Sequence, residues 1–528
     1  MREFSKQIAP HLIQGLRPER RMDRNAEFLH EAFNVRIADT GMEPYRRIVD
    51  PFGGALPVDF PFPQLYIGEM NTLLLYEGGI SIVNRATTPW TLSAMPYRAV
   101  DGEPGSDILP GGVWHIADMK DAFYLFNGET TVAAINNQSE WLIDRVIKIN
   151  TGTHFRGRVV VGGIDPEQIW SRGWHEILTF WQRQDNMLPN IPLDDIGPNF
   201  VMWGSIGGGD FPLWLFDPEI LHRGPIKQLT RDGTHRLPAQ ESYAMDRIRQ
   251  GQFGFMPMPY PGVIYAVKPL GNGVMVYGSE GIAYMPHVSA AEPAPTFGLT
   301  PIMRNGIAGR GAVAGNEHMH VFVDREGDVW RMPADLDLKK LGYREWTRDL
   351  LDSQLSVSHD PKRVDFYIST PDTCFLLTTN GMSQVHQQPT SVSVQGSDLI
   401  GLFNETLVPE YELDDEMRIV TNMFDMNLRG QKTITAFGVG INTASPVRVA
   451  IDYRYSKSEE FKRTHFVTCN KEGNAILRIA GTEFRAVVHV DDYENAELDY
   501  IKVRWQSADK RSIRGVDDSA ALVDTEIQ

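Results

Sequence analysis

IYAVKPLGNGVMVYGSEGIAY, at residues 264–284, contains three short apolar runs separated by glycine-containing turns. Short runs of β-branched and aromatic residues that are bounded by glycine are typical of strands. Glycine reaches the positive φ angles of a tight hairpin at little cost, so the chain is expected to reverse at Glu280-Gly281. The stretch therefore predicts three antiparallel strands, at 264–267, 274–277 and 282–284.

The same pattern recurs from about residue 60 to residue 400. Further sets of apolar runs lie at residues 65–83, 113–134, 311–331 and 355–381, and glycine marks a turn in each of them. Sheets of three or four strands that repeat about every 40–50 residues are the signature of propeller blades. The sequence therefore predicts a β-propeller over this part of the chain.

Beyond residue 416, apolar and polar residues alternate over longer segments. Val447, Val449 and Ile451 share one face of a strand, and residues 484–490 and 501–505 show the same period of two. This period predicts an antiparallel sheet with one buried face and one face in water, hence a β-sandwich. The expected fold class is all-β, a β-propeller followed by a C-terminal antiparallel β-sandwich.

Three segments are predicted from these patterns. Residues 1–50 are expected to be an N-terminal docking segment with a short helix, residues 51–405 the propeller, and residues 406–528 the sandwich. An acidic stretch at residues 403–416 marks the linker before the sandwich. The helix is expected because apolar residues recur at helical spacing after a possible cap at Asp23 or Asn25, namely at Phe28, Leu29, Ala32 and Phe33.

Composition excludes several classes of protein. The chain has 528 residues, which is more than one hydrophobic core supports, and its formal net charge is −17. Because it has no long Lys/Arg cluster, sequence-specific nucleic-acid binding is not expected. Its two cysteines, Cys374 and Cys469, exclude a disulfide framework and a cysteine-based zinc site. No apolar run approaches the ~18 residues of a membrane span, so no membrane span and cytoplasmic synthesis are predicted.

No arrangement of residues in the sequence predicts catalysis, so the chain is expected not to be an enzyme, with no cofactor and no bound metal. His318 and His320 would point to one strand face beside Glu317, but no further ligand follows them. The loop 204–209 is followed by Phe211-Pro212 and not by a helix that could hold a phosphate. Cys374 lies in an apolar strand and is expected to be a small core residue.

Other candidate side chains fit solvated loops or subunit contacts better than a catalytic site. Three pairs of adjacent aspartates lie in polar, turn-like stretches, at residues 194–195, 414–415 and 491–492. A glycosidase instead needs two carboxylates on opposite sides of a cleft. Tryptophans that could stack on sugars gather within a short stretch, but a blade core or subunit interface is expected there: Trp170, Trp174, Trp181, Trp203 and Trp214.

The first fifty residues carry a resemblance to a known family. They contain a Gly-Leu-x-Pro entry at residues 15–18, then Asn34-Val35-Arg36, then a Gly-x-x-Pro turn with arginines at residues 41–47. This order resembles the opening of tail nozzle proteins of short-tailed bacteriophages, the tail tubular protein B group and its hub-like relatives. In that family the segment leads into a β-propeller.

The resemblance implies a structural virion protein, located in the viral tail after assembly in the host cytoplasm. It implies a hexameric ring that contacts a head-to-tail adaptor protein and tail fibre or spike proteins. Double-stranded DNA would pass through the ring during ejection without specific binding, which an acidic wall favours. The residues expected at the ring interfaces are Leu16, Arg17, Phe33, Asn34, Arg36, Pro44 and Arg46.

A second hypothesis belongs to another class of protein. A propeller joined to a β-sandwich also fits a carbohydrate-binding or glycoside-hydrolysing protein with a β-sandwich binding module. A central pocket lined with arginines and carboxylates favours this hypothesis, whereas a wide acidic bore favours the nozzle.

Overall fold

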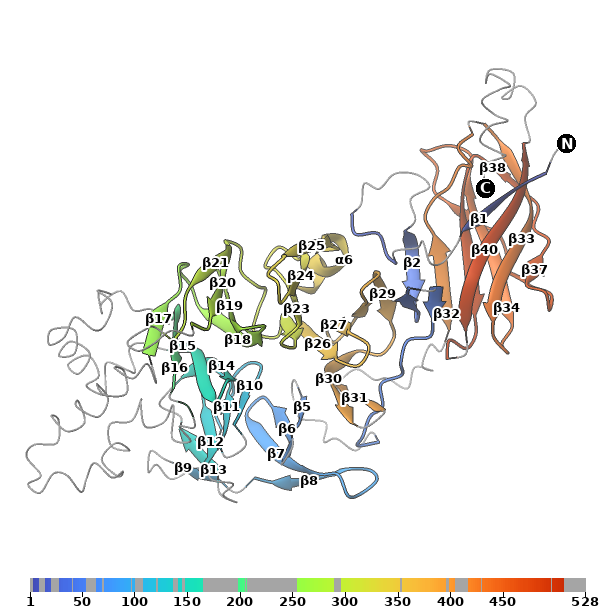
Figure 1. The fold of residues 1–528 in the computed structure, drawn as a ribbon. Helices are drawn as coiled ribbons and strands as arrows, with labels where there is room; N and C mark the ends of the chain where they lie inside the picture. The colour runs from blue at the N-terminus through green and yellow to red at the C-terminus, as the bar shows by residue number, and fades with distance from the viewer. Residues whose placement is uncertain are drawn as a thin grey trace, which may run out of the picture. The chain divides into compact units, whose positions relative to one another are not determined.

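The computed structural model contains strands almost throughout the residues that it describes (Figure 1). These residues are 3–8, 15–19, 28–39, 41–53, 63–68, 71–95, 97–99, 108–119, 122–135, 141–144, 148–164, 198–204, 206, 254–288, 296–351, 354–395, 398–403, 416–428, 430–494 and 496–507. In these ranges the helical elements are one short α-helix, α6 (Arg344–Thr347), and one 3-10 turn, η4 (Arg348–Leu350). The chain is an all-β protein, as predicted.

The chain forms two compact units. Unit 1 comprises residues 1–49, 362–389 and 407–528, and unit 2 comprises residues 50–361 and 390–406. Residues 1–49 and the internal segment 362–389 therefore belong to the same compact unit as the C-terminal strands. The division into domains at 1–50, 51–405 and 406–528 stays a prediction.

Five small sheets, mostly antiparallel, follow one another in the described part of unit 2 (Figure 1). The first contains β5 (Gln64–Ile67), β6 (Thr72–Tyr76), β7 (Gly79–Asn84) and β8 (Thr91–Ala94). The second contains β10 (His115–Asp118), β11 (Ala122–Phe126), β12 (Thr131–Ile135) and β13 (Trp141–Asp144), with β9 (Tyr97–Ala99) parallel to β13. The third contains β14 (Ile149–Phe155), β15 (Arg158–Ile164), β16 (Phe200–Trp203) and β17 (Gly254–Pro257).

The last two of these sheets have the same order of strands. The fourth contains β18 (Ile264–Leu270), β19 (Gly273–Gly278), β20 (Ile282–Pro286) and β21 (Thr300–Met303). The fifth contains β22 (Val313–Gly315), β23 (Met319–Val323), β24 (Val329–Pro333) and β25 (Lys339–Gly342). Strand β26 (Ser356–Asp360) follows, and β30 (Pro389–Gln395) pairs with β31 (Asp398–Phe403). Successive sheets of four strands are the blades of a β-propeller, which confirms the predicted fold class.

The hairpins inside the blades reverse where the sequence predicts them. Gly128 and Gly327 both have a φ of 90°, a conformation that costs glycine little. The residue before each turn caps it: the Asn127 side chain accepts the N–H of Thr130 at 2.6 Å, and the Asp324 carboxylate accepts the N–H of Asp328 at 2.9 Å. These bonds satisfy turn N–H groups that no strand partner reaches.

Apolar side chains pack between neighbouring blades and place the first strands of the blades together. Val160 from the third sheet and Val274 from the fourth, both 0% exposed, belong to one core cluster. Burying such a side chain stabilises a fold by about 1.5–3 kcal/mol. Strand β14 consequently lies against both β10 and β18, the first strands of the sheets on either side of it (Figure 1).

Unit 1 contains the antiparallel β-sandwich, whose first sheet is built on two long strands. β40 (Glu497–Ser507) and β33 (Lys432–Asn442) pair along most of their length. Shorter strands flank them: β1 (Phe4–Ile8) and β4 (Gly41–Glu43) on β40, β3 (Arg36–Ala38) on β4, and β37 (Asn474–Ala475) and β38 (Ile479–Gly481) on β33. Along β40, buried Ile501, Val503 and Trp505 alternate with more exposed residues, as predicted.

The second sheet of unit 1 joins three separate parts of the sequence. Its order is β27 (Asp365–Ser369), β28 (Cys374–Leu377), β29 (Met382–Val385), β2 (Leu29–Phe33), β32 (Met417–Thr421), β39 (Glu483–Val490), β34 (Val447–Arg454) and β35 (Lys462–Arg463), with β36 (Val467–Thr468) also on β34. The prediction of one face in water is wrong for β39, because Val487 on its other face is 0% exposed and packs on Val420 and Ala450.

The predicted N-terminal helix is wrong, because residues 29–33 form strand β2. The strand contains a β-bulge: Leu29 lies opposite Thr421, Glu31 opposite Val420 and Ala32 opposite Ile419, so that one residue is extra. The extra residue turns Leu29 and Ala32, three positions apart, to the same buried face. A bulged strand therefore imitates the apolar spacing of a helix.

Strand β2 is fixed by polar contacts within unit 1 on its C-terminal side. Asn34, which is 0% exposed and has a φ of 56°, donates to the carbonyl of Glu416 at 2.9 Å and accepts the N–H of His386 at 2.9 Å. Arg36 forms a bidentate pair with Asp365, at 2.7 Å through Nε and 2.9 Å through Nη2. The Arg36 and Asp365 side chains are 14% and 3% exposed, so this pair is shielded from solvent.

We expect Arg36→Ala to lower the free energy of unfolding of unit 1 by about 3–5 kcal/mol, because it leaves the buried Asp365 carboxylate without its bidentate partner. Urea unfolding followed by near-UV circular dichroism measures this. Arg47→Ala is the matched control: Arg47 pairs with Glu494, both side chains are about half exposed, and a loss of only about 0.2–1 kcal/mol is expected. Equal losses in both variants would show that the Arg36 pair has no special structural weight.

Candidate functional site

Charged and imidazole side chains gather where the first strands of the blades meet. We call His115, Lys268, Arg310, His320 and His359 the cationic cluster. His115 lies on β10, Lys268 on β18 and His359 on β26, which are first strands. Arg310 precedes β22, and His320 lies on the next strand, β23. All five residues belong to unit 2.

Thr151 on β14 connects two members of the cationic cluster. Its hydroxyl lies 3.1 Å from Nδ1 of His115 and accepts the backbone N–H of Val267 at 3.0 Å. Two short contacts thus lead from the His115 ring to the residue beside Lys268. The apolar strand contacts between β10, β14 and β18 hold this arrangement in place.

Tyr277 connects a third member to the same strand. Its hydroxyl lies 2.8 Å from Nδ1 of His320, and both side chains are 0% exposed. Tyr277 lies opposite Ala266 in the β18–β19 ladder. Ala266 and Lys268 are two positions apart in one strand, so they share a face of β18.

Burial determines the protonation of the imidazoles. It lowers the pKa of His115 well below its usual value and that of His320 to about 3, and the positive charge of Lys268 lowers both pKa values further. Burial and Lys268 likewise lower the pKa of His359, against the charge of Asp360. The buried histidines are therefore neutral at pH 7.

Several donors and acceptors of the cationic cluster are not used by the protein. Within the described residues, Nε2 of His115 and Nε2 of His320 have no hydrogen-bond partner. Burial lowers the pKa of Lys268, and the described ranges contain no ion pair or hydrogen bond of its ammonium group. Buried polar groups are rarely left unpaired, so this cluster differs from ordinary core packing.

Arg310, a member of the cationic cluster, lies close to Tyr265. Arg310 is partly buried, and its Nη1 donates to the carbonyl of Asn127 in the second sheet. Burial lowers the pKa of Arg310, while nearby Glu129 and Tyr265 act in the opposite direction. The partly buried aromatic ring of Tyr265 thus lies close to a guanidinium group, and the arrangement can hold an anionic or polar ligand by charge and hydrogen bonds.

Sequence reasoning missed the cationic cluster. Its members are far apart in the sequence, and only the pairing of strands brings them together. One signal was present: Lys268 interrupts the otherwise apolar strand IYAVKPL at residues 264–270. A lysine in a strand of this kind needs either water or a counter-charge.

The residues predicted at ring interfaces make contacts inside unit 1. Leu16 is 1% exposed and its N–H donates to the carbonyl of Met382 at 2.7 Å, while the N–H of Arg17 donates to Leu29 at 3.3 Å. The Phe33 ring lies 5.6 Å from the Arg418 guanidinium. Asn34 and Arg36 make the contacts given above, and Pro44 and Arg46 are partly buried. Their role in binding a partner stays a prediction.

The other sequence candidates do not come together as one site. The His318 side chain is 80% exposed beside Glu317, whereas His320 points at Tyr277, and the described residues contain no group of three metal ligands. Cys374 is 0% exposed in β28, which confirms it as a core residue, and burial raises its pKa. Asp491 pairs with Arg448.

Of the five tryptophans only Trp203 lies among the described residues, and the centroid of its ring lies 5.1 Å from that of the Phe297 ring. The remaining candidates lie outside the described residues: Trp170, Trp174, Trp181, Trp214, most of the loop 204–209, and the aspartates at 194–195 and 414–415. In the described part of unit 2, Trp203 thus belongs to a core cluster and not to an exposed sugar platform.

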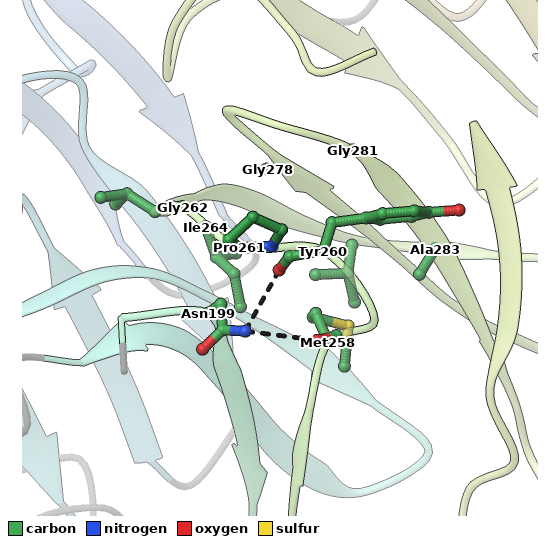
Figure 2. Close-up of a pocket in the computed structure, with 11 residues that line it drawn as sticks. Asn199, Met258, Tyr260, Pro261, Gly262, Ile264, Gly278, Gly281 and Ala283 are labelled. Atoms are coloured by element: carbon green, nitrogen blue, oxygen red, sulfur yellow. Dashed lines mark hydrogen bonds between the residues drawn. The ribbon is translucent and has the colours of Figure 1, made fainter. Parts of the chain in front are cut away.

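A separate small pocket lies between the third and fourth sheets (Figure 2). Asn199 closes one side of it and donates to the carbonyls of Met258 at 3.2 Å and Tyr260 at 3.1 Å. The volume inside it, about 10 Å³, is far below the roughly 300–1,000 Å³ of ligand pockets. No charged side chain lines it, so it offers little chemistry.

No family model matches the chain, and no curated protein matches it. Several solved structures are similar. PorZ, a surface component of the type-IX secretion system of Porphyromonas gingivalis, matches with 8% identity and a TM-score of 0.31, over 68% of this chain and 35% of that one. The chain therefore spans about a third of PorZ.

Two further structures match over most of their length. AztD from Citrobacter koseri is 9% identical with a TM-score of 0.32, over 79% of this chain and 89% of that one. An exo-beta-1,3-galactanase from Phanerochaete chrysosporium is 9% identical with a TM-score of 0.25, over 86% of this chain and 98% of that one. Likeness at this level assigns no substrate or partner to the chain.

One expectation is corrected by these findings. The prediction that the chain is not an enzyme is contradicted by the match to a glycoside hydrolase and is withdrawn. None of the three structures is described as a phage tail component, and at TM-scores of 0.25 to 0.32 they favour neither functional hypothesis. No described helix is long and apolar enough to cross a membrane.

Burial of neutral His320 makes stability depend on pH. Its pKa is lower in the folded than in the unfolded protein, so between pH 6.5 and about 3 the unfolded state binds more protons and stability falls as pH falls. We expect the free energy of unfolding to fall between pH 7 and pH 5 by about 2 kcal/mol less in His320→Gln than in the wild type. Urea unfolding at the two pH values measures this difference. Exposed His318→Gln, the control, should follow the wild type; a similar gain there would rule out burial as the cause.

Proposed function

We propose that the protein is a carbohydrate-binding β-propeller that carries a β-sandwich. The observation that carries this proposal is the meeting of Tyr265, Lys268, Arg310 and His359, all partly buried, at the first strands of the blades. Tyr265 and Lys268 come from β18, Arg310 precedes β22 and His359 comes from β26, and the Lys268 ammonium group stands without an ion pair among the described residues, in a part of the propeller that is otherwise apolar.

The chemistry of this group suits a sugar. A ligand site needs apolar or aromatic surface for contact and a few placed polar groups for orientation. Tyr265 supplies an aromatic ring, onto which the C–H face of a sugar ring stacks, and Lys268 and Arg310 supply donors for its oxygen atoms. The cluster is also basic, which differs from the acidic wall expected of a nozzle; of the arginines and carboxylates expected in a carbohydrate pocket it contains Arg310.

A ring component of a virion tail is the second candidate, and two observations favour it. Residues 15–47 resemble the opening of tail nozzle proteins, and the chain as a whole is acidic, with a net charge of −17. In this proposal unit 1 contacts neighbouring copies and an adaptor ring, tail fibres or spikes attach to the side, and DNA passes without specific binding.

We expect the protein to bind at least one oligosaccharide from a panel of neutral and acidic chains, and Tyr265→Ala to weaken that binding about tenfold, or about 1.4 kcal/mol, because it removes the stacking surface. Isothermal titration calorimetry measures the affinity, and released reducing ends report hydrolysis. Tyr455→Ala, at a 43% exposed tyrosine of unit 1, is the control and should bind as the wild type does. Absence of binding across the panel would reject the proposal.

The second candidate is tested by mass. A closed ring of six copies follows from heterologous contacts that repeat around an axis, so native mass spectrometry at micromolar concentration, with and without adaptor protein, should show hexamers of the 59.5 kDa chain. A mass of one chain under both conditions would exclude this candidate.

A further inference from the structure

We propose that Lys268 binds an acidic group, a carboxylate or a sulfate, so that the saccharide recognised by the propeller is an acidic one. This inference rests on the proposed function and adds the chemical class of the ligand to it. It is carried by three observations: an ammonium group without a counter-charge, neighbouring side chains that are neutral or, at Arg310, positively charged, and partly exposed side chains through which a ligand reaches it.

The first observation concerns the place of Lys268 in its strand. Ala266, Lys268 and Leu270 alternate along β18 and share one face, and Ala266 and Leu270 are 0% exposed. Lys268 is therefore the polar residue on an otherwise apolar strand face, and the described residues contain no ion pair with its ammonium group. A partly buried ammonium group is stabilised when an anion lies close to it.

The second observation concerns the groups around Lys268. The charge of Lys268 lowers the pKa of His115, of His320 and of His359, so all three lie near it. Arg310 also lowers the pKa of His115. The nearby carboxylates have other partners: Glu129 pairs with Lys148 at 2.6 Å, and Asp360 is 1% exposed and has an interaction of its own. The two charged members of the cluster, Lys268 and Arg310, therefore attract an anion.

The third observation concerns access. Lys268, Arg310 and His359 are partly exposed, whereas His115 and His320 are closed off behind them. A single carboxylate or sulfate group can therefore reach the ammonium and guanidinium groups. Arg310 also donates to the Asn127 carbonyl, so one of its donors is already used by the protein.

The test uses a pair of ligands that share one sugar backbone and differ in charge and by a methyl group on each carboxyl: oligogalacturonate and its methyl ester. We expect the wild type to bind the acid at least tenfold more tightly than the ester in isothermal titration calorimetry. In Lys268→Gln this preference should fall below threefold. Lys339→Gln is the matched control, because Lys339 lies on β25, is half exposed and pairs with Asp337, and it should keep the full preference.

A second measurement keeps the test independent of sugar binding. Sulfate should raise the melting temperature of the wild type and of Lys339→Gln, and it should leave that of Lys268→Gln unchanged. If Lys268→Gln does not fold, the apolar variant Lys268→Met takes its place, with the same expected result. Equal stabilisation of all folded variants by sulfate would overturn the inference.

The outcomes separate this inference from the proposed function. Equal affinity for the acid and the ester overturns the acidic ligand and leaves carbohydrate binding intact. A Lys268-dependent effect of sulfate, with neither sugar bound, overturns the acidic saccharide and counts against the proposed function as well. Lys268-dependent binding of a 20-base-pair DNA duplex, without saccharide binding, assigns the site to nucleic acid and also overturns the inference.

Discussion

The second sheet of unit 1 depends on a strand that comes from the opposite end of the sequence. β2 lies between β29 and β32, and backbone hydrogen bonds join it to both sides. The backbone N–H of Asn34 donates to the carbonyl of Gln384 at 2.8 Å, and the backbone N–H of Asn422 donates to the carbonyl of Phe28 at 3.1 Å. Without β2, two strand edges would expose unpaired N–H and C=O groups. Gly15 supports the same arrangement, because a Cβ atom there would meet the Met382 carbonyl oxygen at 2.5 Å.

Hairpins were the part of the fold that the sequence predicted best. Their two signals, an apolar run and a glycine turn, are local, and the bonds from Asn127 and Asp324 that close the turns are local as well. The N-terminal helix was predicted wrongly because a β-bulge is a property of two paired strands, and the partner strand β32 lies almost 400 residues away. The buried outer face of β39 was missed for a similar reason, since Val420 and Ala450 cover part of it from other strands.

The candidate site was beyond the reach of sequence reasoning, although its residues are ordinary. Whether Lys268 lies beside His115 depends on the side-by-side placement of β10, β14 and β18, and on the Thr151 hydroxyl that bonds to both outer strands. The converse also occurred. Asn34 and Arg36 stand out in the sequence, and they were assigned to docking, whereas the structure shows strong contacts of both side chains inside unit 1.

The discontinuous composition of unit 1 has a consequence for its synthesis. A ribosome adds about 5–20 residues per second, so roughly 20–75 seconds separate the emergence of β2 from that of β32. The sequence of unit 2 is synthesised and completed within that time, whereas β2 still lacks its partner strand β32. Leu16, Leu29 and Ala32, all about 1% exposed in the finished protein, are then apolar surface in the growing chain. The nascent protein therefore passes through a stage in which its oldest residues are its least protected, and chaperone binding or pairing with a neighbouring nascent chain would act on them first.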